Sequence, residues 1–100
     1  MARTRIAELK DLPPGAGTSV DAAGRTLALF NVDGTLYAVD NTCPHRGGPL
    51  AEGDLDGAVV TCPWHGWRYD VTTGVRDGTP TVRVACYPVT IVDGVAYVDL

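Results

Sequence analysis

The sequence predicts an all-β protein, and three observations support this fold class. The dipeptide Asp-Gly occurs four times, at 33–34, 56–57, 77–78 and 93–94, and it suits tight hairpin turns because both residues tolerate positive φ. Short apolar or β-branched segments flank these turns. No long stretch shows the apolar period of an amphipathic helix. We therefore expect short strands that pair mostly antiparallel.

The expected elements follow one another along the chain. Residues 11–24 are rich in Pro, Gly and small side chains, so we expect a loop or an irregular strand there. The segments that border the Asp-Gly turns are expected to form strands, at 25–30, 35–40, 58–61, 88–92 and 95–100. Val82, Val84 and Cys86 alternate along one further strand and share a face, so Cys86 is expected to be a buried free thiol.

Length and composition limit the class of protein. One hundred residues with 45% hydrophobic content predict a single domain over 1–100 with a modest core. The net charge of -4 argues against a general nucleic-acid binder, which needs a surplus of Lys and Arg, and favours a positively charged protein partner. No apolar run approaches the roughly 20 residues that span a bilayer, and no secretion signal is evident, so we expect no membrane contact.

Cysteine and histidine residues are few and grouped. Three cysteines cannot make a paired disulfide framework, which fits a reducing compartment, the cytoplasm by default, and points to metal chemistry. Cys43-Pro44-His45 is followed after sixteen residues by Cys62-Pro63-Trp64-His65. Thiolates with imidazoles suit zinc or iron–sulfur sites. A structural zinc module is one alternative, but its usual order is a Cys pair followed by a His pair. One mixed pair on each of two loops suits a two-metal cluster better.

These two boxes resemble those of the Rieske [2Fe-2S] ferredoxin family, which read C-x-H and C-x-x-H about sixteen residues apart. "GGPL" after the first box, Gly-Trp-x-Tyr-Asp after the second and the closing "YPVTIVDGVAYVDL" hairpin also match. The resemblance implies a Rieske-type antiparallel β sandwich with a cluster-binding subdomain made of two ligand loops, about 43–50 and 62–70. It also implies one [2Fe-2S] cluster. By position, its ligands are Cys43 and Cys62 on the inner iron and His45 and His65 on the outer iron.

Some residues depart from the high-potential members of this family. Those proteins carry an extra Cys in each box, joined as a disulfide, and a Ser shortly after the second His. This chain has Gly48, Trp64 and Trp67 at these places. Tyr69 stands where the family has a Tyr that donates a hydrogen bond. The resemblance therefore implies a reduction potential towards the lower end of the roughly -150 to +300 mV Rieske range.

The second box also resembles that of ring-hydroxylating oxygenases, which need a separate iron on two His and one carboxylate. Both histidines of this chain are assigned to the cluster, and no dinucleotide fingerprint is present. We therefore expect an electron carrier rather than an enzyme. The carrier takes one electron from a flavin-dependent NAD(P)H reductase and passes it to a terminal oxygenase. The alternative within the resemblance is a Rieske-like small subunit of a multi-chain reductase, such as NADH-dependent nitrite reductase.

Overall fold

The computed structural model describes residues 3–43, 47–64, 66–79 and 81–99 and is built from β-strands, which confirms the predicted fold class. The strands are β1 (Arg3–Glu8), β2 (Gly17–Ala22), β3 (Arg25–Val32), β4 (Thr35–Asp40), β5 (Asp54–Asp56), β6 (Val59–Thr61), β7 (Arg68–Asp70), β8 (Cys86–Tyr87), β9 (Val89–Val92) and β10 (Val95–Asp99). Two single 3-10 turns, η1 (Leu9–Asp11) and η2 (Leu50–Glu52), interrupt them. Within the described ranges, no helix is long and apolar enough to cross a membrane.

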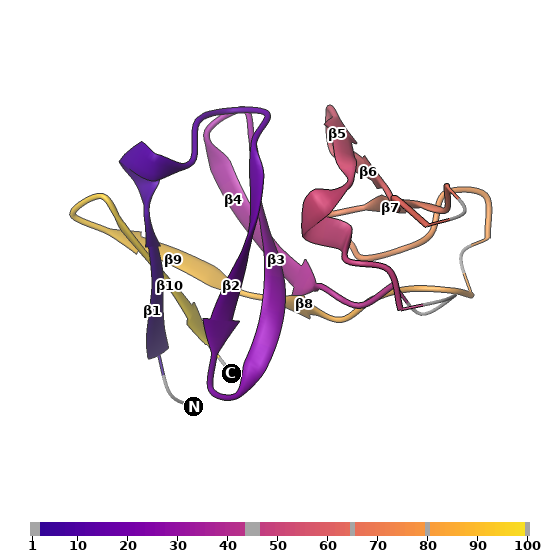
Figure 1. Ribbon diagram of the computed structural model, residues 1–100. Coiled ribbons are helices and arrows are strands. Elements are labelled where there is room, and N and C mark those ends of the chain that lie inside the picture. Colours follow the sequence, from indigo (N-terminus) through magenta and orange to yellow (C-terminus); the bar gives the residue numbers. More distant parts are fainter. Residues whose placement is uncertain (1–2, 44–46, 65, 80, 100) are drawn as a thin grey trace.

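The strands form three antiparallel sheets, arranged along the molecule (Figure 1). The first sheet has the order β1-β10-β9, the second β2-β3-β4-β8 and the third β5-β6-β7. The second sheet lies between the other two (Figure 1). The predicted sandwich corresponds to the first two sheets. The predicted ligand loops lie in a subdomain that also contains the third sheet.

Strand β3 is buried on both faces, and this explains its continuous apolar run "LALF". Successive side chains of a strand point to opposite faces of its sheet. Leu27 and Leu29 belong to a core that includes Ala96 and Val98 of β10. Ala28 and Phe30 belong to a second core, which contains buried side chains of the ligand-loop subdomain: Cys43, Leu50, Val60, Cys62, Tyr69, Val71 and Val84. The middle sheet therefore supports both outer layers.

Three of the four Asp-Gly dipeptides connect paired strands as predicted. They join β3 to β4, β5 to β6 and β9 to β10. At 33–34 and 93–94 both residues have positive φ, between 50° and 93°, which is the geometry of a type I′ turn. The dipeptide at 77–78 instead lies in a wider loop, which is closed by the backbone hydrogen bond from Arg76 N–H to the Val82 carbonyl, 2.8 Å.

Two regions differ from the expected elements. Residues 17–22, expected within a loop or irregular strand, form the regular strand β2, whose six residues all pair with β3. Gly17 is required there, because a Cβ at this position would lie 2.6 Å from Phe30 Cδ1. Strand β1 has no counterpart among the predicted strands. It pairs with β10 across a register shift between Arg5 and Ala7, which interrupts the alternation that marks a strand in sequence.

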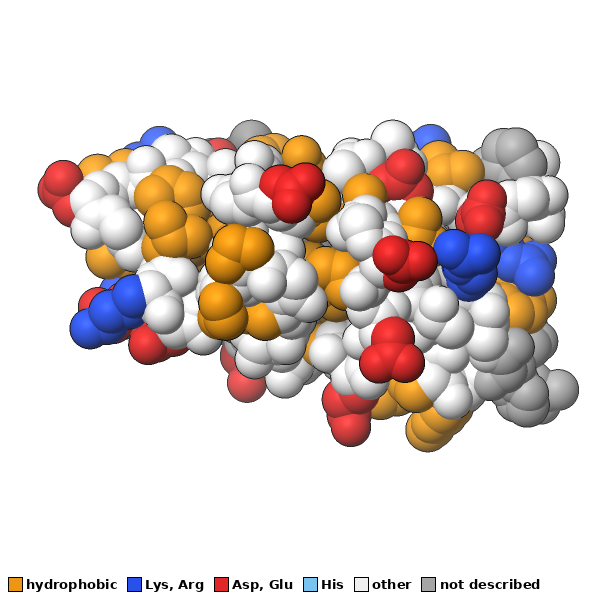
Figure 2. Space-filling view, turned by 90° about the horizontal axis from the view of Figure 1, so that it is seen from above, with side chains coloured by type: hydrophobic (Ala, Val, Ile, Leu, Met, Phe, Trp, Pro, Cys, Tyr) orange, Lys and Arg blue, Asp and Glu red, His pale blue; other side chains and the backbone are white. Residues whose placement is uncertain are grey.

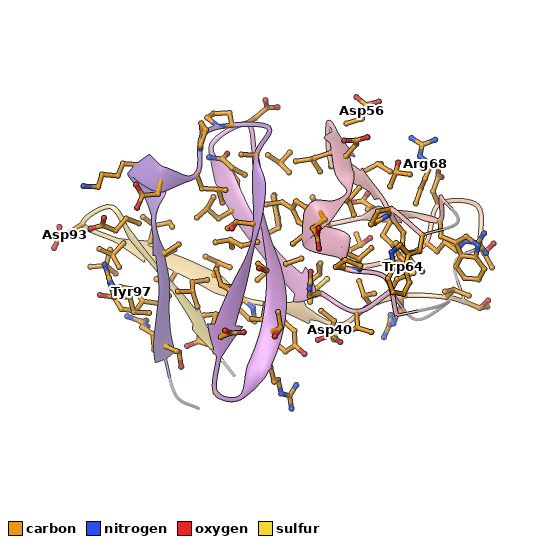
Figure 3. All side chains as sticks on the ribbon, viewed as in Figure 1. Asp40, Asp56, Trp64, Arg68, Asp93 and Tyr97 are labelled. Atoms are coloured by element: carbon orange, nitrogen blue, oxygen red, sulfur yellow. The ribbon has the colours of Figure 1, made fainter. Side chains whose placement is uncertain are left out.

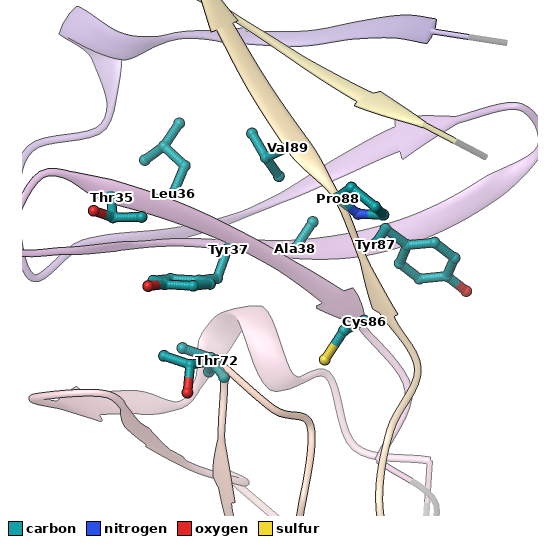
Figure 4. Close-up of a pocket in the computed structure, with 10 residues that line it drawn as sticks. Thr35, Leu36, Tyr37, Ala38, Thr72, Cys86, Tyr87, Pro88 and Val89 are labelled. Carbon is teal, nitrogen blue, oxygen red and sulfur yellow. The ribbon is translucent and has the colours of Figure 1, made fainter. Parts of the chain in front are cut away.

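The prediction that Cys86 is buried is wrong. Val84 is buried, but Cys86 is exposed. The expected strand is also shorter, because β8 covers only Cys86 and Tyr87. Cys86 lines an open pocket of about 370 Å³ between β4, Thr72 and Val89 (Figure 4). The alternation of apolar residues could not predict the exposure of Cys86. The pocket that Cys86 lines forms only where the subdomain meets the middle sheet.

Gly74 offers a test of how the subdomain is joined to the strand that follows it. Its φ is +79°, and a Cβ there would lie 2.2 Å from the Val84 carbonyl oxygen. We expect Gly74→Ala to combine backbone strain of about 1–2 kcal/mol with overpacking of about 1–3 kcal/mol. Gly24→Ala is the matched control, because Gly24 has φ +80° and open space around its Cβ position.

Thermal unfolding followed by circular dichroism compares the two variants. Gly74→Ala should unfold at least about 4 °C below Gly24→Ala, because 1 kcal/mol shifts Tm by about 4–8 °C in a domain of this size. Equal melting temperatures would show that the close approach of Gly74 to the Val84 carbonyl does not contribute to the stability of the subdomain.

Candidate metal centre

The two predicted ligand loops have the same backbone hydrogen-bond pattern. In the first loop, Cys43 N–H donates to the Gly48 carbonyl (2.9 Å) and Gly47 N–H donates to the Cys43 carbonyl (2.7 Å). In the second loop, Cys62 N–H donates to the Trp67 carbonyl (2.7 Å) and Gly66 N–H donates to the Cys62 carbonyl (3.2 Å). Each loop thus closes on its own cysteine, by bonds to residues four and five positions further on.

Glycine at the fourth position after each cysteine allows this closure. Gly47 has φ +78° and Gly66 has φ +74°, a left-handed conformation that glycine adopts without steric cost. Each loop therefore makes a tight turn at its glycine, whose amide donates to the cysteine carbonyl described above.

The strands and the turn that flank the two ligand loops fix where each loop begins and ends. The second loop connects β6 to β7, which are paired to each other. The first loop runs from the end of β4 to η2, where the Leu50 N–H donates to the Asn41 carbonyl (2.7 Å). The Asn41 side-chain oxygen accepts from the Ala51 N–H (2.9 Å). Both loops are thus anchored to strands or turns on either side.

Cys43 and Cys62 lie side by side in the interior, each 1% exposed. Burial raises the pKa of Cys62, the Trp64 backbone amide opposes this rise, and the nearby Cys43 thiol raises the pKa further. Two adjacent buried thiols resist losing both protons unless a cation compensates the charge. This donor pair therefore fits a site that binds a metal, which supplies that compensation.

Tyr69 is fully buried beside this pair, with its phenol oxygen 3.3 Å from Cys43 Sγ. Burial raises the pKa of Tyr69 far above its usual value, and both cysteines raise it further. The phenol is therefore protonated at neutral pH and can donate to a thiolate at Cys43. A donor to a ligand sulfur withdraws electron density from the metal centre and favours its reduced form. The hydrogen-bonding role expected for Tyr69 is consistent with this geometry.

Gly48 and Trp64 bring the two loops into direct contact. A Cβ at Gly48 would lie 2.8 Å from Cys62 Sγ and 3.0 Å from Trp64 Cγ. The indole of Trp64 therefore packs across Gly48, although Trp64 as a whole is 50% exposed. Figure 3 shows Trp64 at the end of the molecule farthest from Asp93 and Tyr97. At the places where high-potential members carry a disulfide, this chain has an apolar contact between a glycine and a tryptophan.

Of the four predicted ligands, the structure places the two cysteines, whereas His45 and His65 lie outside the described residues. The described residues fit an iron–sulfur cluster in three respects. They supply two adjacent thiols, a phenol donor to one sulfur, and a glycine at position 48 that lets the second loop come close to the first.

The comparisons with known proteins agree with this geometry. Residues 2–88 match the Rieske [2Fe-2S] domain. The ferredoxin component of the naphthalene 1,2-dioxygenase/salicylate 5-hydroxylase systems of Ralstonia sp is 39% identical over 84 residues, which are 83% of this chain and 81% of that protein.

Two solved structures are similar over nearly their whole length. The ferredoxin of carbazole 1,9a-dioxygenase from Nocardioides aromaticivorans IC177 matches with a TM-score of 0.91 and 30% identity, over 98% of this chain and 97% of that one. A chain in the complex of reduced oxygenase and oxidized ferredoxin in carbazole 1,9a-dioxygenase matches with a TM-score of 0.88 and 34% identity, over 96% and 91%.

An all-β fold with two such loops around a buried cysteine pair defines an iron–sulfur protein of the Rieske class. This chain belongs to the Rieske [2Fe-2S] domain family, and its similarity is to the ferredoxin components of dioxygenase systems. The predicted family is confirmed. Membership implies one Rieske [2Fe-2S] cluster.

One pair of residues near the site was not anticipated as a unit. Arg76 stacks on Trp67, with the guanidinium carbon 3.4 Å from the ring centroid. Arg76 is nine positions from Trp67 in sequence, and the contact arises because Arg76 forms an isolated bridge with Tyr69. No short sequence motif records such a pairing, so only the folded structure reveals it.

The close approach at Gly48 leads to a direct test. We expect Gly48→Ala to lower the iron and sulfide content per chain, because the added methyl group pushes on Cys62 Sγ and Trp64 at a cost of about 1–3 kcal/mol. Gly47→Ala is the control, since its Cβ would meet only Thr42 Cγ2 at 3.9 Å and adds backbone strain alone. Full cluster content in Gly48→Ala, together with loss in Gly47→Ala, would contradict the steric explanation.

Proposed function

We propose that this protein is a ferredoxin component that carries one electron from a flavin-dependent NAD(P)H reductase to a terminal oxygenase. The observation that supports this most directly is the buried Cys43–Cys62 pair between two like-built loops, in a chain that matches ferredoxin components over most of both lengths. When bound, a [2Fe-2S] cluster accepts and releases single electrons. The role of the protein is then to hold it, shield its inner side and present its outer side.

The proposed ligands are Cys43 and Cys62 on the inner iron and His45 and His65 on the outer iron. The burial of both cysteines supports the inner assignment, because the thiols belong to the same core as Phe30. The assignment of His45 and His65 rests on their positions in the two boxes. Neutral imidazoles in place of two thiolates leave the oxidised cluster without net charge, which makes it easier to reduce than an all-cysteine cluster.

Charge and shape support partners that are proteins. Figure 2 shows carboxylates spread over the face of the molecule that is seen from above, with basic side chains towards both ends of that face. The net charge of -4 suits transient encounter with a positively charged surface, which increases the rate of association more than its strength. The exposed indole of Trp64 adds an apolar element close to the proposed outer iron. We further propose that the carrier works in the cytoplasm.

The ligand assignment predicts different results for the three cysteines. Cys43→Ser and Cys62→Ser should lose the visible absorption and the iron and sulfide of the cluster, because each removes an iron–thiolate bond. Cys86→Ser should keep them, because Cys86 is exposed and lies in another part of the fold. His45→Ala and His65→Ala should also lose the cluster. Full cluster content in any of these four ligand variants, or loss in Cys86→Ser, would contradict the assignment.

A carrier and a fixed subunit differ in how they bind their partners. With the reductase and oxygenase of the source organism's own ring-hydroxylating system, product formation should require this protein, saturate with its concentration and slow as ionic strength rises from about 0.01 to 0.15 M, where the screening length falls from about 30 to 8 Å. Stable co-purification with a large reductase subunit, at one copy per subunit, would instead indicate the small subunit of a multi-chain reductase.

A further inference from the structure

Arg76 occupies an unusual position for a charged side chain. Its guanidinium carbon lies over the Trp67 ring, 3.4 Å from the ring centroid, and one of its terminal nitrogens donates to the Thr79 hydroxyl oxygen (3.3 Å). Its Nε atom is buried without a hydrogen-bond partner among the described residues. Buried polar nitrogens without partners are rare because their desolvation costs free energy. The stacking interaction and the local charge environment must therefore offset this cost.

The side chain of Arg76 lies on the face of the small sheet that carries Tyr69. The two residues face each other in an isolated antiparallel bridge, and paired residues project to the same side of a sheet. Trp67 precedes Tyr69 by two positions and shares that face. Tyr69 in turn contacts Cys43 Sγ.

Among the residues that the structure describes, no carboxylate forms an ion pair with Arg76. The neighbouring Asp77 forms its ion pair with Arg68, at 3.6 Å. Arg68 alternates with Trp67 and Tyr69 along the strand and is on the opposite, exposed face. The charge of Arg68 in β7 therefore faces solvent. The charge of Arg76, which bridges to Tyr69 of the same strand, lies on the face that carries Trp67 and Tyr69.

We propose that Arg76 raises the reduction potential of the cluster. It does so because its positive charge is held in a fixed place over Trp67, beside the second ligand loop. This inference rests on the proposed function, because it concerns the cluster that the site holds. Reduction adds one negative charge to a cluster that is neutral when oxidised with neutral imidazoles. A partly buried positive charge nearby stabilises the reduced form, since screening there is weaker than in water. Stacking on the indole fixes the distance over which that charge acts.

The test compares three variants by redox titration of the loaded protein. Arg76→Gln removes the charge, Arg76→Lys keeps it, and Arg68→Gln removes a charge from the opposite face of the same region. We expect Arg76→Gln to lower the equilibrium constant for reduction by about threefold to tenfold, where tenfold is about 59 mV for one electron. Arg76→Lys should restore most of this loss. Arg68→Gln should change the constant by less than about twofold, because its charge is exposed and screened.

The electron paramagnetic resonance spectrum of each reduced variant verifies that its cluster is intact. An unshifted potential in Arg76→Gln, or the same shift in Arg68→Gln, would overturn the proposal. If Arg76→Gln does not retain a cluster, Arg76→Lys decides. In Arg76→Lys, a potential close to that of the wild type supports the role of charge. A potential lower by about 59 mV, which corresponds to a tenfold lower equilibrium constant for reduction, contradicts it. Absence of a cluster signal from the wild type would contradict the proposed function instead, so the two failures are distinguishable.

Discussion

The two-sided burial of β3 is the constraint on which the rest of this structure depends. Its odd-numbered leucines pack against the terminal strand β10, and the alternate residues Ala28 and Phe30 pack against the subdomain that contains both cysteines. The cysteines are thus part of a hydrophobic core and not merely of two surface loops. Displacing either cysteine side chain would disturb the packing that holds the subdomain to the middle sheet.

Closure of the two ligand loops depends on small, local interactions. Each loop folds back on its cysteine with the same pair of backbone hydrogen bonds, and Trp64 packs across Gly48 where they meet. No disulfide links the described cysteines. Such a contact constrains the loops less than a covalent bridge does.

Much of this could be predicted from sequence because the decisive signals are local. The Asp-Gly turns, the apolar segments around them and the two spaced Cys/His boxes each depend on a few adjacent residues. The predictions failed where distant parts of the chain decide the outcome. Cys86 is exposed in a strand that pairs over only two residues, and all six residues of β2 pair with β3.

The site shows the same division. The boxes predict the cysteine pair that the structure brings together, and His45 and His65 remain predictions. The stacking of Arg76 on Trp67 requires the bridge between residues 69 and 76, which no spacing in the sequence announces. The contact between Gly48 and Trp64 was likewise visible in sequence only as a departure from the high-potential members of the family. That a side chain at position 48 would clash with Trp64 and Cys62 can be seen only in the folded loops.

The most direct test of the central claim is spectroscopic. Visible absorption and low-temperature electron paramagnetic resonance are recorded on the purified protein before and after dithionite, with iron, sulfide and zinc assayed on the same sample. We expect two irons and two sulfides per chain, and a reduced signal whose average g lies below that of all-cysteine clusters. A protein that binds one zinc, and stays colourless and silent after reconstitution with iron and sulfide, would contradict the electron-transfer account.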